Sequence, residues 1–434
     1  MQISRYYSVL VALLGAGMLC FAVDYINLDI YSSSVTYQKP QQSVVESLFQ
    51  EGWNSFKSSV NDVVFADNIS TEQFWNALRG SLHDGTFYNK IANAQTVDSQ
   101  KGADVFLSAV YSSIKQVPVK YMSLTPGGDS ITLSGKIFLP PSKNAKNIII
   151  ANHYTICANS EAPSEANSIE GIYASKGYIV LMPDYIGYGI SADLPHPYMH
   201  LHSAVTSALD MLKAAIPYLS ANSYTFYKPL ILLGYSQGAA VTLALQRELE
   251  EKYPNQYSIQ KVFAGAGPYN LSGTFDYYTS SRTTDISCTL PMLFIGMNYA
   301  ENLGLKREDF FTPTLMQKCP IVIERKSMTM NEVNKELGNQ IDQLLTPVIY
   351  NRDTFPTSVL YEAVGRNNTL NWTPKANLYL FHSTEDNMVP FLNSQTIADE
   401  FNKHGLINVH YDFAPYGDHM NGAVTFFEKV YKSL

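Results

Sequence analysis

The spacing of apolar and polar positions changes several times along the chain. Strand-like apolar runs occur at 147–154, 179–185, 229–233, 261–267, 377–382 and 408–413. Unbroken Val/Ile/Leu runs are typical of strands that are buried on both faces of a sheet. Between them, apolar residues recur at helical spacing over 168–178, 203–219 and 239–251. Strands alternating with helices predict an α/β fold with a mostly parallel, doubly wound sheet.

Other segments do not follow this alternation. Two alternating runs around a Pro-Gly-Gly-Asp turn, at 117–141, predict a hairpin. Residues 23–116 are polar and mixed, and their spacing predicts an N-terminal helical segment. Residues 271–375 are rich in aromatic residues and Met and interrupt the sheet, so we expect an insertion that folds over one end of it. The core would then comprise 117–270 and 376–434.

The first residues have the pattern of a secretory signal. Arg5 precedes an apolar stretch from Val9 to Ala22 that is too short to span a bilayer comfortably. We therefore expect residues 1–22 to be cleaved and the protein to be secreted or periplasmic. Lipid anchoring through Cys20 is the less favoured alternative, because Leu19 is too bulky for a typical lipobox.

Export affects how the other cysteines are interpreted. Three remain after cleavage, and an odd number in an oxidising compartment suggests one pair and one thiol. We expect Cys288 and Cys319 to form a bridge within the insertion and Cys157 to stay a buried thiol. Glycan acceptor motifs, usable only in a eukaryotic host, occur at Asn68, Asn270, Asn367 and Asn371.

The overall charge excludes one class of partner. The net charge is −8 and charged residues make up only 16% of the chain. Such a protein has no basic face for a phosphate backbone, so nucleic-acid binding is not expected.

The sequence Gly-Tyr-Ser-Gln-Gly at 234–238 lies between a predicted strand and a predicted helix. A Gly-x-Ser-x-Gly turn in this position is a nucleophile elbow, in which a strained serine projects at the edge of a sheet. Glycines are needed on both sides because strand and helix pass too close for a Cβ. Ser236 is therefore the candidate nucleophile.

A serine hydroxyl needs a base, and the base needs an acid that orients it. Glu385 and Asp386 follow the strand at 377–382, and His419 lies in a Gly/Asn-rich loop after the last strand. Neighbours on an extended segment point to opposite sides, so only one of the two carboxylates can face His419. The 33 residues from 386 to 419 accommodate one helix and one strand.

The remaining histidines are interpreted as structural. His196, His200 and His202 cluster in the sequence, but they lack Cys or carboxylate neighbours at ligand spacing, so no metal site is expected. His382, within the strand before the acid, is interpreted as a packed polar residue.

An acyl-transfer site also needs two N–H donors for an oxyanion. Gln237, directly after the serine, would supply one of them. The second would come from the loop after the strand at 147–154, where Thr155 is the first choice and Tyr154 the second.

Taken together, these residues resemble the α/β-hydrolase superfamily over roughly 117–434. Within it, the sequences PDYIGYG (183–189), HPY (196–198), GYSQG (234–238) and TEDNMVP (384–390) look like the secreted lipase family of fungal lipase A enzymes and bacterial secreted relatives. The resemblance implies a helical cap between the late strands, which matches 271–375. It also favours Asp386 over Glu385 as the acid.

We therefore expect an exported serine hydrolase that cleaves carboxylic esters through an acyl-enzyme and needs no metal or organic cofactor. Its partner would be a small-molecule or lipid ester, with transient contact to a lipid interface. A peptidase acting near proline is the alternative enzyme, but it would need an acidic pair for the substrate amine. A non-catalytic binding module would lack a member of the triad, and none is missing.

Overall fold

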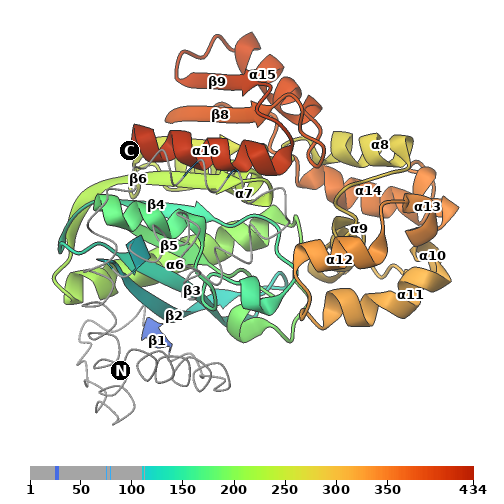
Figure 1. The fold of residues 1–434 in the computed structure, drawn as a ribbon, viewed down its shortest axis with the longest axis horizontal. Helices are drawn as coiled ribbons and strands as arrows, with labels where there is room; N and C mark the ends of the chain where they lie inside the picture. Colours follow the sequence, from blue (N-terminus) through green and yellow to red (C-terminus); the bar gives the residue numbers. More distant parts are fainter. Residues whose placement is uncertain (1–24, 29–74, 76–78, 80–109, 112) are drawn as a thin grey trace, which may run out of the picture.

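The computed structural model describes residues 25–28, 75, 79, 110, 111 and 113–434. The predicted signal peptide and Asn68 lie outside these residues. At the centre of the described part is one sheet with the strand order β1-β2-β3-β5-β4-β6-β7-β8-β9 (Figure 1). The pairs β2–β3 and β3–β5 are antiparallel, and all other neighbours are parallel. The predicted mostly parallel sheet is confirmed.

Each predicted apolar run overlaps a strand of the sheet. The strands are β1 Ile26–Leu28, β2 Lys115–Leu124, β3 Ser130–Leu139, β4 Asn144–Asn152, β5 Ile179–Pro183, β6 Thr225–Tyr235, β7 Ile259–Gly265, β8 Asn377–Ser383 and β9 Val409–Ala414. The predicted hairpin at 117–141 is β2 and β3. Strand β1 comes from the segment 23–116 and pairs with β2, so part of that segment belongs to the sheet rather than to a helix.

Helices cover both faces of the sheet. The elements of the core are η1 Asn159–Glu161, η2 Ile169–Lys176, η3 Gly189–Ser191, α6 Leu201–Ala221, α7 Gln237–Lys252, α15 Leu392–Lys403 and α16 His419–Ser433. Successive residues of a strand point to opposite faces. In β4, Ile148 and Ile150 belong to the same buried cluster as residues of α6, α7 and α15, whereas Ile149 belongs to a second cluster with residues of η2 and α16. The sheet is therefore doubly wound.

Residues 271–375, which we call the cap lobe, form short helices beside the sheet (yellow to orange in Figure 1). They are α8 Leu271–Ser281, α9 Thr289–Ala300, α10 Arg307–Phe310, α11 Pro313–Cys319, η4 Pro320–Glu324, α12 Met330–Leu337, α13 Ile341–Leu344, η5 Pro347–Tyr350 and α14 Thr357–Arg366. Side-chain caps explain several starts: Asn270 accepts from Gly273 N, and Thr312 from Leu315 N. The lobe contains no named strand.

Lys326 connects the cap lobe to the core. Its Nζ donates to the carbonyl oxygens of Gly187, Ala192 and Leu194, at 2.6, 2.7 and 2.5 Å. Burial lowers the pKa of this ammonium to about 8. Three acceptors satisfy all three of its donors, so the contact fixes the lobe against the core loop 187–194.

The predicted bridge between Cys288 and Cys319 is wrong, whereas the prediction that Cys157 is a buried thiol is confirmed. Cys157, Cys288 and Cys319 are all buried free thiols. A hydrogen bond with the Cys288 thiol, together with burial, raises the pKa of the Cys157 thiol. Cys288 precedes α9 and faces the core loop that carries Cys157, whereas Cys319 ends α11. Sequence separation alone had suggested a pairing inside the lobe.

Two of the glycan motifs are engaged in the fold. The Asn367 side chain is buried, accepts from Leu201 N and donates to Ala363 O. Asn270 is the cap of α8. Asn371, in contrast, is exposed. Of the predicted glycan positions that the structure describes, Asn371 is therefore the accessible one.

Candidate active site

The strand-to-helix turn at Ser236 has the strained geometry that the sequence predicts. Ser236 follows β6 and precedes α7, with φ of 56° and ψ of −125°. A Cβ on Gly238 would lie 2.0 Å from Asn152 O, and one on Gly234 would lie 2.1 Å from Gly238 O. No side chain fits at either glycine, because strand and helix approach this closely.

Asp386 and His419 form a hydrogen-bonded pair. His419 is the first residue of α16, and its Nδ1 lies 2.6 Å from Asp386 Oδ2. Both side chains are almost fully buried. Glu385, the competing carboxylate, instead accepts from the backbone N–H of Gly417. The loop after β8 thus directs Asp386, and not its neighbour, at the imidazole.

The Asp386 carboxylate is held by more than His419. Its Oδ1 accepts from the backbone N–H groups of Met388 and Val389, at 2.9 and 2.8 Å. Its Oδ2 also lies 3.3 Å from His382 Nε2. Burial by itself would raise the pKa of Asp386, but the charge of His419 and the hydrogen bonds from both histidines outweigh it and hold the pKa well below its usual range.

Tyr235 connects the nucleophile candidate to His419. Its hydroxyl donates to the His419 backbone oxygen at 2.7 Å, and the two rings are 4.9 Å apart. Ser236, the next residue, donates its N–H to Gly265 O at 2.9 Å. Ser236 and His419 are therefore gathered at the same edge of the sheet, and each is about 5% exposed or less.

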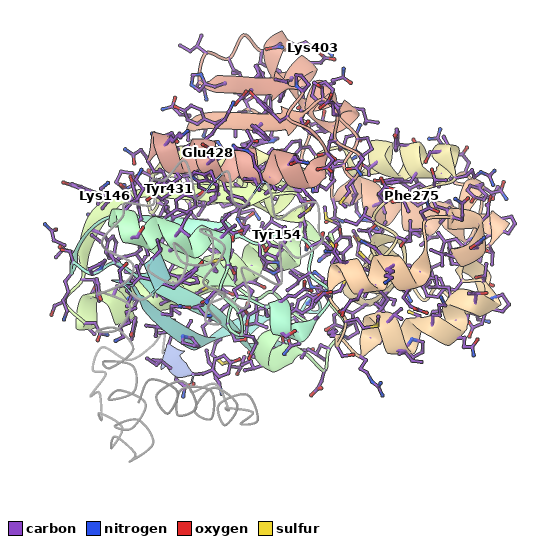
Figure 2. The ribbon with its side chains drawn as sticks, viewed as in Figure 1. Lys146, Tyr154, Phe275, Lys403, Glu428 and Tyr431 are labelled. Carbon is purple, nitrogen blue, oxygen red and sulfur yellow. The ribbon has the colours of Figure 1, made fainter. Side chains whose placement is uncertain are left out.

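The loop after β4 presents a backbone donor. Burial lowers the pKa of His153 to about 4, so at neutral pH the ring is neutral and carries one N–H; its Nδ1 lies 2.6 Å from Tyr154 O and its Nε2 lies 3.2 Å from Asp184 O. In a planar trans peptide the C=O and the next N–H point in opposite directions. The N–H of Thr155 is thus turned away from His153. Figure 2 shows Tyr154 in the core near the cap lobe, and Phe275 within the lobe.

The other predicted donor, Gln237, is held in place by a side-chain contact. It is the first residue of α7, so its N–H has no acceptor within the helix. Its side-chain Nε2 lies 3.2 Å from His196 Nε2, and His196 Nδ1 lies 2.7 Å from Ile186 O. Sequence reasoning missed this support, because residues 196 and 237 are far apart along the chain. Within the described residues, no cluster of three or more His, Cys, Asp or Glu side chains has metal-binding geometry.

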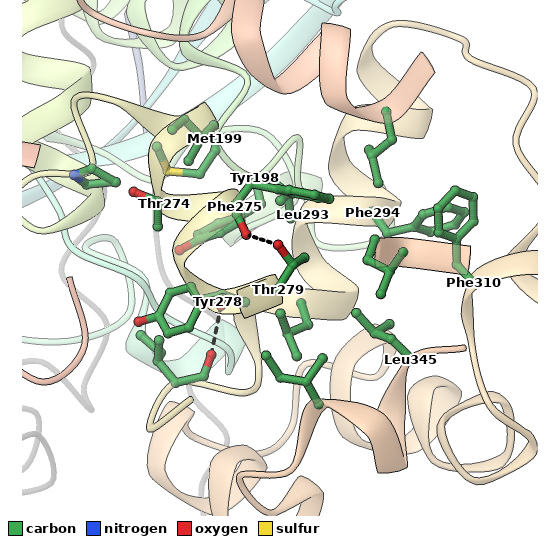
Figure 3. A pocket seen from close by; sticks show the side chains of 18 residues that line it. Tyr198, Met199, Thr274, Phe275, Tyr278, Thr279, Leu293, Phe294, Phe310 and Leu345 are labelled. Carbon is green, nitrogen blue, oxygen red and sulfur yellow. Dashed lines mark hydrogen bonds between the residues drawn. The ribbon is translucent and has the colours of Figure 1, made fainter. Parts of the chain in front are cut away.

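A mostly apolar cavity lies between the core and the cap lobe. Tyr198 and Met199 of the core line it together with Phe275, Leu293 and Phe294 of the lobe. Figure 3 shows Tyr198 and Met199 beside Phe275, with Phe294 on the opposite side in that view.

The wall of this cavity touches both loops of the site. The Tyr198 hydroxyl is 2.9 Å from Thr155 Oγ1. The Tyr278 hydroxyl donates to the backbone oxygen of Met388, two residues after Asp386. Two residues of the cavity wall therefore contact the loops that carry Thr155 and Asp386.

One comparison with known proteins shows the family of this chain. The model of the family described as "Secretory lipase" matches residues 164–427, which is more than half of the chain. A search of curated protein sequences found no match. No helix among the described residues is both long and apolar enough to cross a membrane.

Solved structures share the fold at low sequence identity. The rice cell wall degrading esterase LipA from Xanthomonas oryzae superposes with a TM-score of 0.65 at 23% identity, over 75% of this chain and 91% of that one. A Legionella pneumophila protein assigned as a hydrolase gives 0.68 at 22%, over 74% and 88%. Candida antarctica lipase A gives 0.56 at 16%, over 71% and 74%.

Proposed function

This chain belongs to the secretory lipase family, and we propose that it is an exported serine hydrolase that cleaves carboxylic esters through an acyl-enzyme. The observation that carries the proposal is the hydrogen-bonded pair of Asp386 and His419 beside the strained Ser236 turn. An acid, an imidazole and a serine at one sheet edge are the parts that acyl transfer requires.

In the proposed reaction, the Ser236 hydroxyl attacks the ester carbonyl and His419 Nε2 takes its proton. Asp386 accepts from Nδ1, which fixes the tautomer and stabilises the imidazolium. The imidazolium then gives the proton to the departing alcohol, leaving an acyl-Ser236 ester. Water, activated by the same imidazole, attacks this ester and releases the acid.

The oxyanion would be held by the N–H groups of Gln237 and Thr155. Gln237 N–H lies at the first turn of α7, where the helix dipole favours negative charge. The contact of its side chain with His196 restrains the residue. The Thr155 peptide is oriented by the contact of His153 Nδ1 with Tyr154 O. Donors that are fixed in advance stabilise the oxyanion without reorganising.

We assign the acyl chain to the cavity under the cap lobe. Its lining is largely aliphatic and aromatic, and its wall contacts the loops of Thr155 and Asp386 through Tyr198 and Tyr278. Each buried CH₂ of an acyl chain contributes roughly 0.8 kcal/mol. The preferred substrates are therefore esters of medium or long apolar acids, lipids among them.

The proposal is tested by replacing the nucleophile. Ser236→Ala should abolish labelling by a fluorophosphonate probe and lower hydrolysis of p-nitrophenyl esters by a factor on the order of 10⁴ or more. Ser280→Ala, in the exposed part of α8, serves as the control and should label like the native protein. Undiminished labelling of Ser236→Ala would overturn the assignment. Faster cleavage of proline amides than of every ester would replace the esterase with a peptidase.

A further inference from the structure

His382 lies next to Oδ2 of the Asp386 carboxylate, whereas the backbone amides of Met388 and Val389 bind Oδ1. It is in β8, four residues before Asp386, and its side chain is fully buried. Its Nε2 is 3.3 Å from Asp386 Oδ2, the same oxygen that lies 2.6 Å from His419 Nδ1. One carboxylate oxygen is therefore shared by two imidazole rings.

The contacts of His382 determine which of its nitrogens carries the proton. Nε2 also lies 3.0 Å from Val389 O, and neither that carbonyl nor the carboxylate can donate. Nε2 must therefore bear the hydrogen. Nδ1 is 2.7 Å from Ser394 Oγ and accepts from this hydroxyl. Every polar atom of the ring has a partner, and the tautomer is fixed by α15 on one side and by the acid loop on the other.

We propose that His382 is a positioning residue for the reaction assigned above: it shares its Nε2–H between Val389 O, at 3.0 Å, and Asp386 Oδ2, at the longer distance of 3.3 Å, and so holds the charged carboxylate in place against His419. The inference rests on the proposed function. His382 touches no substrate atom and acts through Asp386. Burial of an unpaired carboxylate is costly, and this donor completes the four that surround it.

A buried histidine at this place could serve packing alone. Its ring does pack edge-on against Phe391, with centroids 5.5 Å apart. Packing, however, requires only a ring, whereas the two directed hydrogen bonds at Nδ1 and Nε2 require an imidazole or another side chain with matching polar atoms. The two roles are distinguished by removing the donor while keeping a polar side chain.

Loss of the donor has a definite effect on proton binding. The Asp386–His419 pair has a net charge of −1 when the imidazole is neutral and 0 when it is protonated. A donor to Oδ2 stabilises the state of charge −1 more, because there the carboxylate charge is uncompensated. Without the donor the pair binds its proton more tightly, and the acid limb of the pH profile of kcat/KM moves to higher pH.

Few other titratable groups face this pair. Tyr278 of α8 donates to Met388 O, and Glu385 accepts from Gly417 N. Asp285 accepts from Asn387 Nδ2, in the acid loop itself. None of these side chains contacts Asp386 Oδ2 among the hydrogen bonds of the described residues, so the two histidines dominate its environment.

The test compares His382→Asn with His382→Gln. The shorter amide can still pair with Ser394 but does not reach Asp386, whereas the longer one places an N–H where Nε2 stood. We expect His382→Asn to lose about tenfold in kcat and to shift the acid limb upward by about one pH unit. His382→Gln should restore most of both. His410→Phe, in exposed β9, is the control and should behave like the native enzyme.

A folded His382→Asn variant with native kcat and native acid limb would overturn the inference. Equal losses in the Asn and Gln variants, with no shift of the acid limb, would do so as well, because they would indicate packing. The pH titration of the His419 Nδ1–H proton resonance gives the same comparison without any substrate. Failure of the proposed function would appear separately, as native protein that neither takes up the fluorophosphonate probe nor cleaves esters.

Discussion

The core around Ser236 and the cap lobe opposite it are packed by different contacts. Every fully buried charged or histidine side chain among the described residues belongs to the core, and none lies within 271–375. The lobe is held by apolar contacts, such as Phe294 against Phe310 and Phe311, with ring centroids 4.8 and 5.0 Å apart. At the Ser236 turn, in contrast, backbones approach so closely that a single Cβ has no space.

This difference follows from what each region has to do. Proton transfer and oxyanion binding depend on distances that must hold within a fraction of an ångström, so they need directed hydrogen bonds and rigid backbone. An acyl chain needs only apolar surface of a suitable length, which short helices can provide without directional contacts. Substitutions should therefore affect the chemistry in the core and the choice of substrate in the lobe.

The largest contrast is expected from one substitution made in both regions. In Gly238→Ala the new Cβ would meet Asn152 O at 2.0 Å, so the turn has to shift. We expect a loss of at least about 10²-fold in ester hydrolysis, or failure to fold. Gly365→Ala, in α14, brings its Cβ 3.3 Å from Ser272 Oγ, a close contact that a small movement of this short side chain relieves, so the variant should fold and keep native turnover.

The measurement is ester turnover per fluorophosphonate-labelled molecule, together with the thermal midpoint of each variant. A fully active Gly238→Ala would show that the core tolerates as much as the lobe, and the comparison would fail.

A second prediction concerns acyl-chain length. Leu290 and Leu293 line the cavity and are only half-buried, so polar replacements there should not unfold the lobe. In the double variant Leu290→Asn/Leu293→Asn, hydrolysis of long-chain esters should fall about 10²-fold, because several CH₂ groups lose apolar contact. Hydrolysis of acetate esters should remain within about twofold of the native value.

The control for this prediction is Ile321→Asn, an exposed position of the lobe that does not line the cavity. Its profile of kcat/KM against chain length should match that of the native enzyme. If the double variant loses acetate and long-chain activity in equal proportion, the cavity is not the acyl site.

The third effect is expected on stability rather than on turnover, at Glu170 in the core. Both carboxylate oxygens are buried without a hydrogen-bond partner, and burial raises the pKa of this group to about 7 from an ordinary value of 4.5. The pKa of Glu170 is higher in the folded protein than in the unfolded chain. The stability that this side chain contributes is therefore fully present below pH 4.5 and is lost as the pH rises toward 7. The unfolding free energy of Glu170→Gln relative to the native protein should therefore rise by about 3 kcal/mol between pH 4.5 and pH 8.

Chemical denaturation at the two pH values measures this difference. Glu336→Gln, an exposed carboxylate of the lobe, should give the same relative stability at both. A pH-independent difference for Glu170→Gln would mean that this carboxylate is not desolvated in the folded protein.

Much of the fold could be predicted from the sequence, because buried parallel strands have continuous apolar runs. The run at 229–233 located β6, although the strand extends over Thr225–Tyr235. Its first residues, 225–228, are exposed or half-buried and include Thr225 and Lys228, so they do not continue the buried apolar run. The turn at Ser236 was equally clear, since its two glycines are required by backbone contact.

Contacts between distant side chains could not be predicted. His382 was interpreted as a packed residue, because nothing in β8 indicates that Asp386 and Ser394 meet its two nitrogens. The bridge expected between Cys288 and Cys319 does not form, because the Cys288 thiol instead contacts the Cys157 thiol. The contact of His153 with Tyr154 O, which bears on the expected choice of Thr155 over Tyr154, leaves no signal in the sequence either. Spacing along a chain carries no information on such contacts.

The contact of Lys326 has a consequence for exchanging parts between relatives. Its three acceptors are in the core loop 187–194. This loop is followed by His196, whose ring contacts the side chain of Gln237. A chimera that received a foreign cap but kept the native loop would lose the Lys326 ammonium and leave these three carbonyls without their donor, close to the residue that contacts Gln237. The cap lobe and the loop 187–194 would therefore have to be exchanged together. Relatives that differ in substrate choice should differ in both segments.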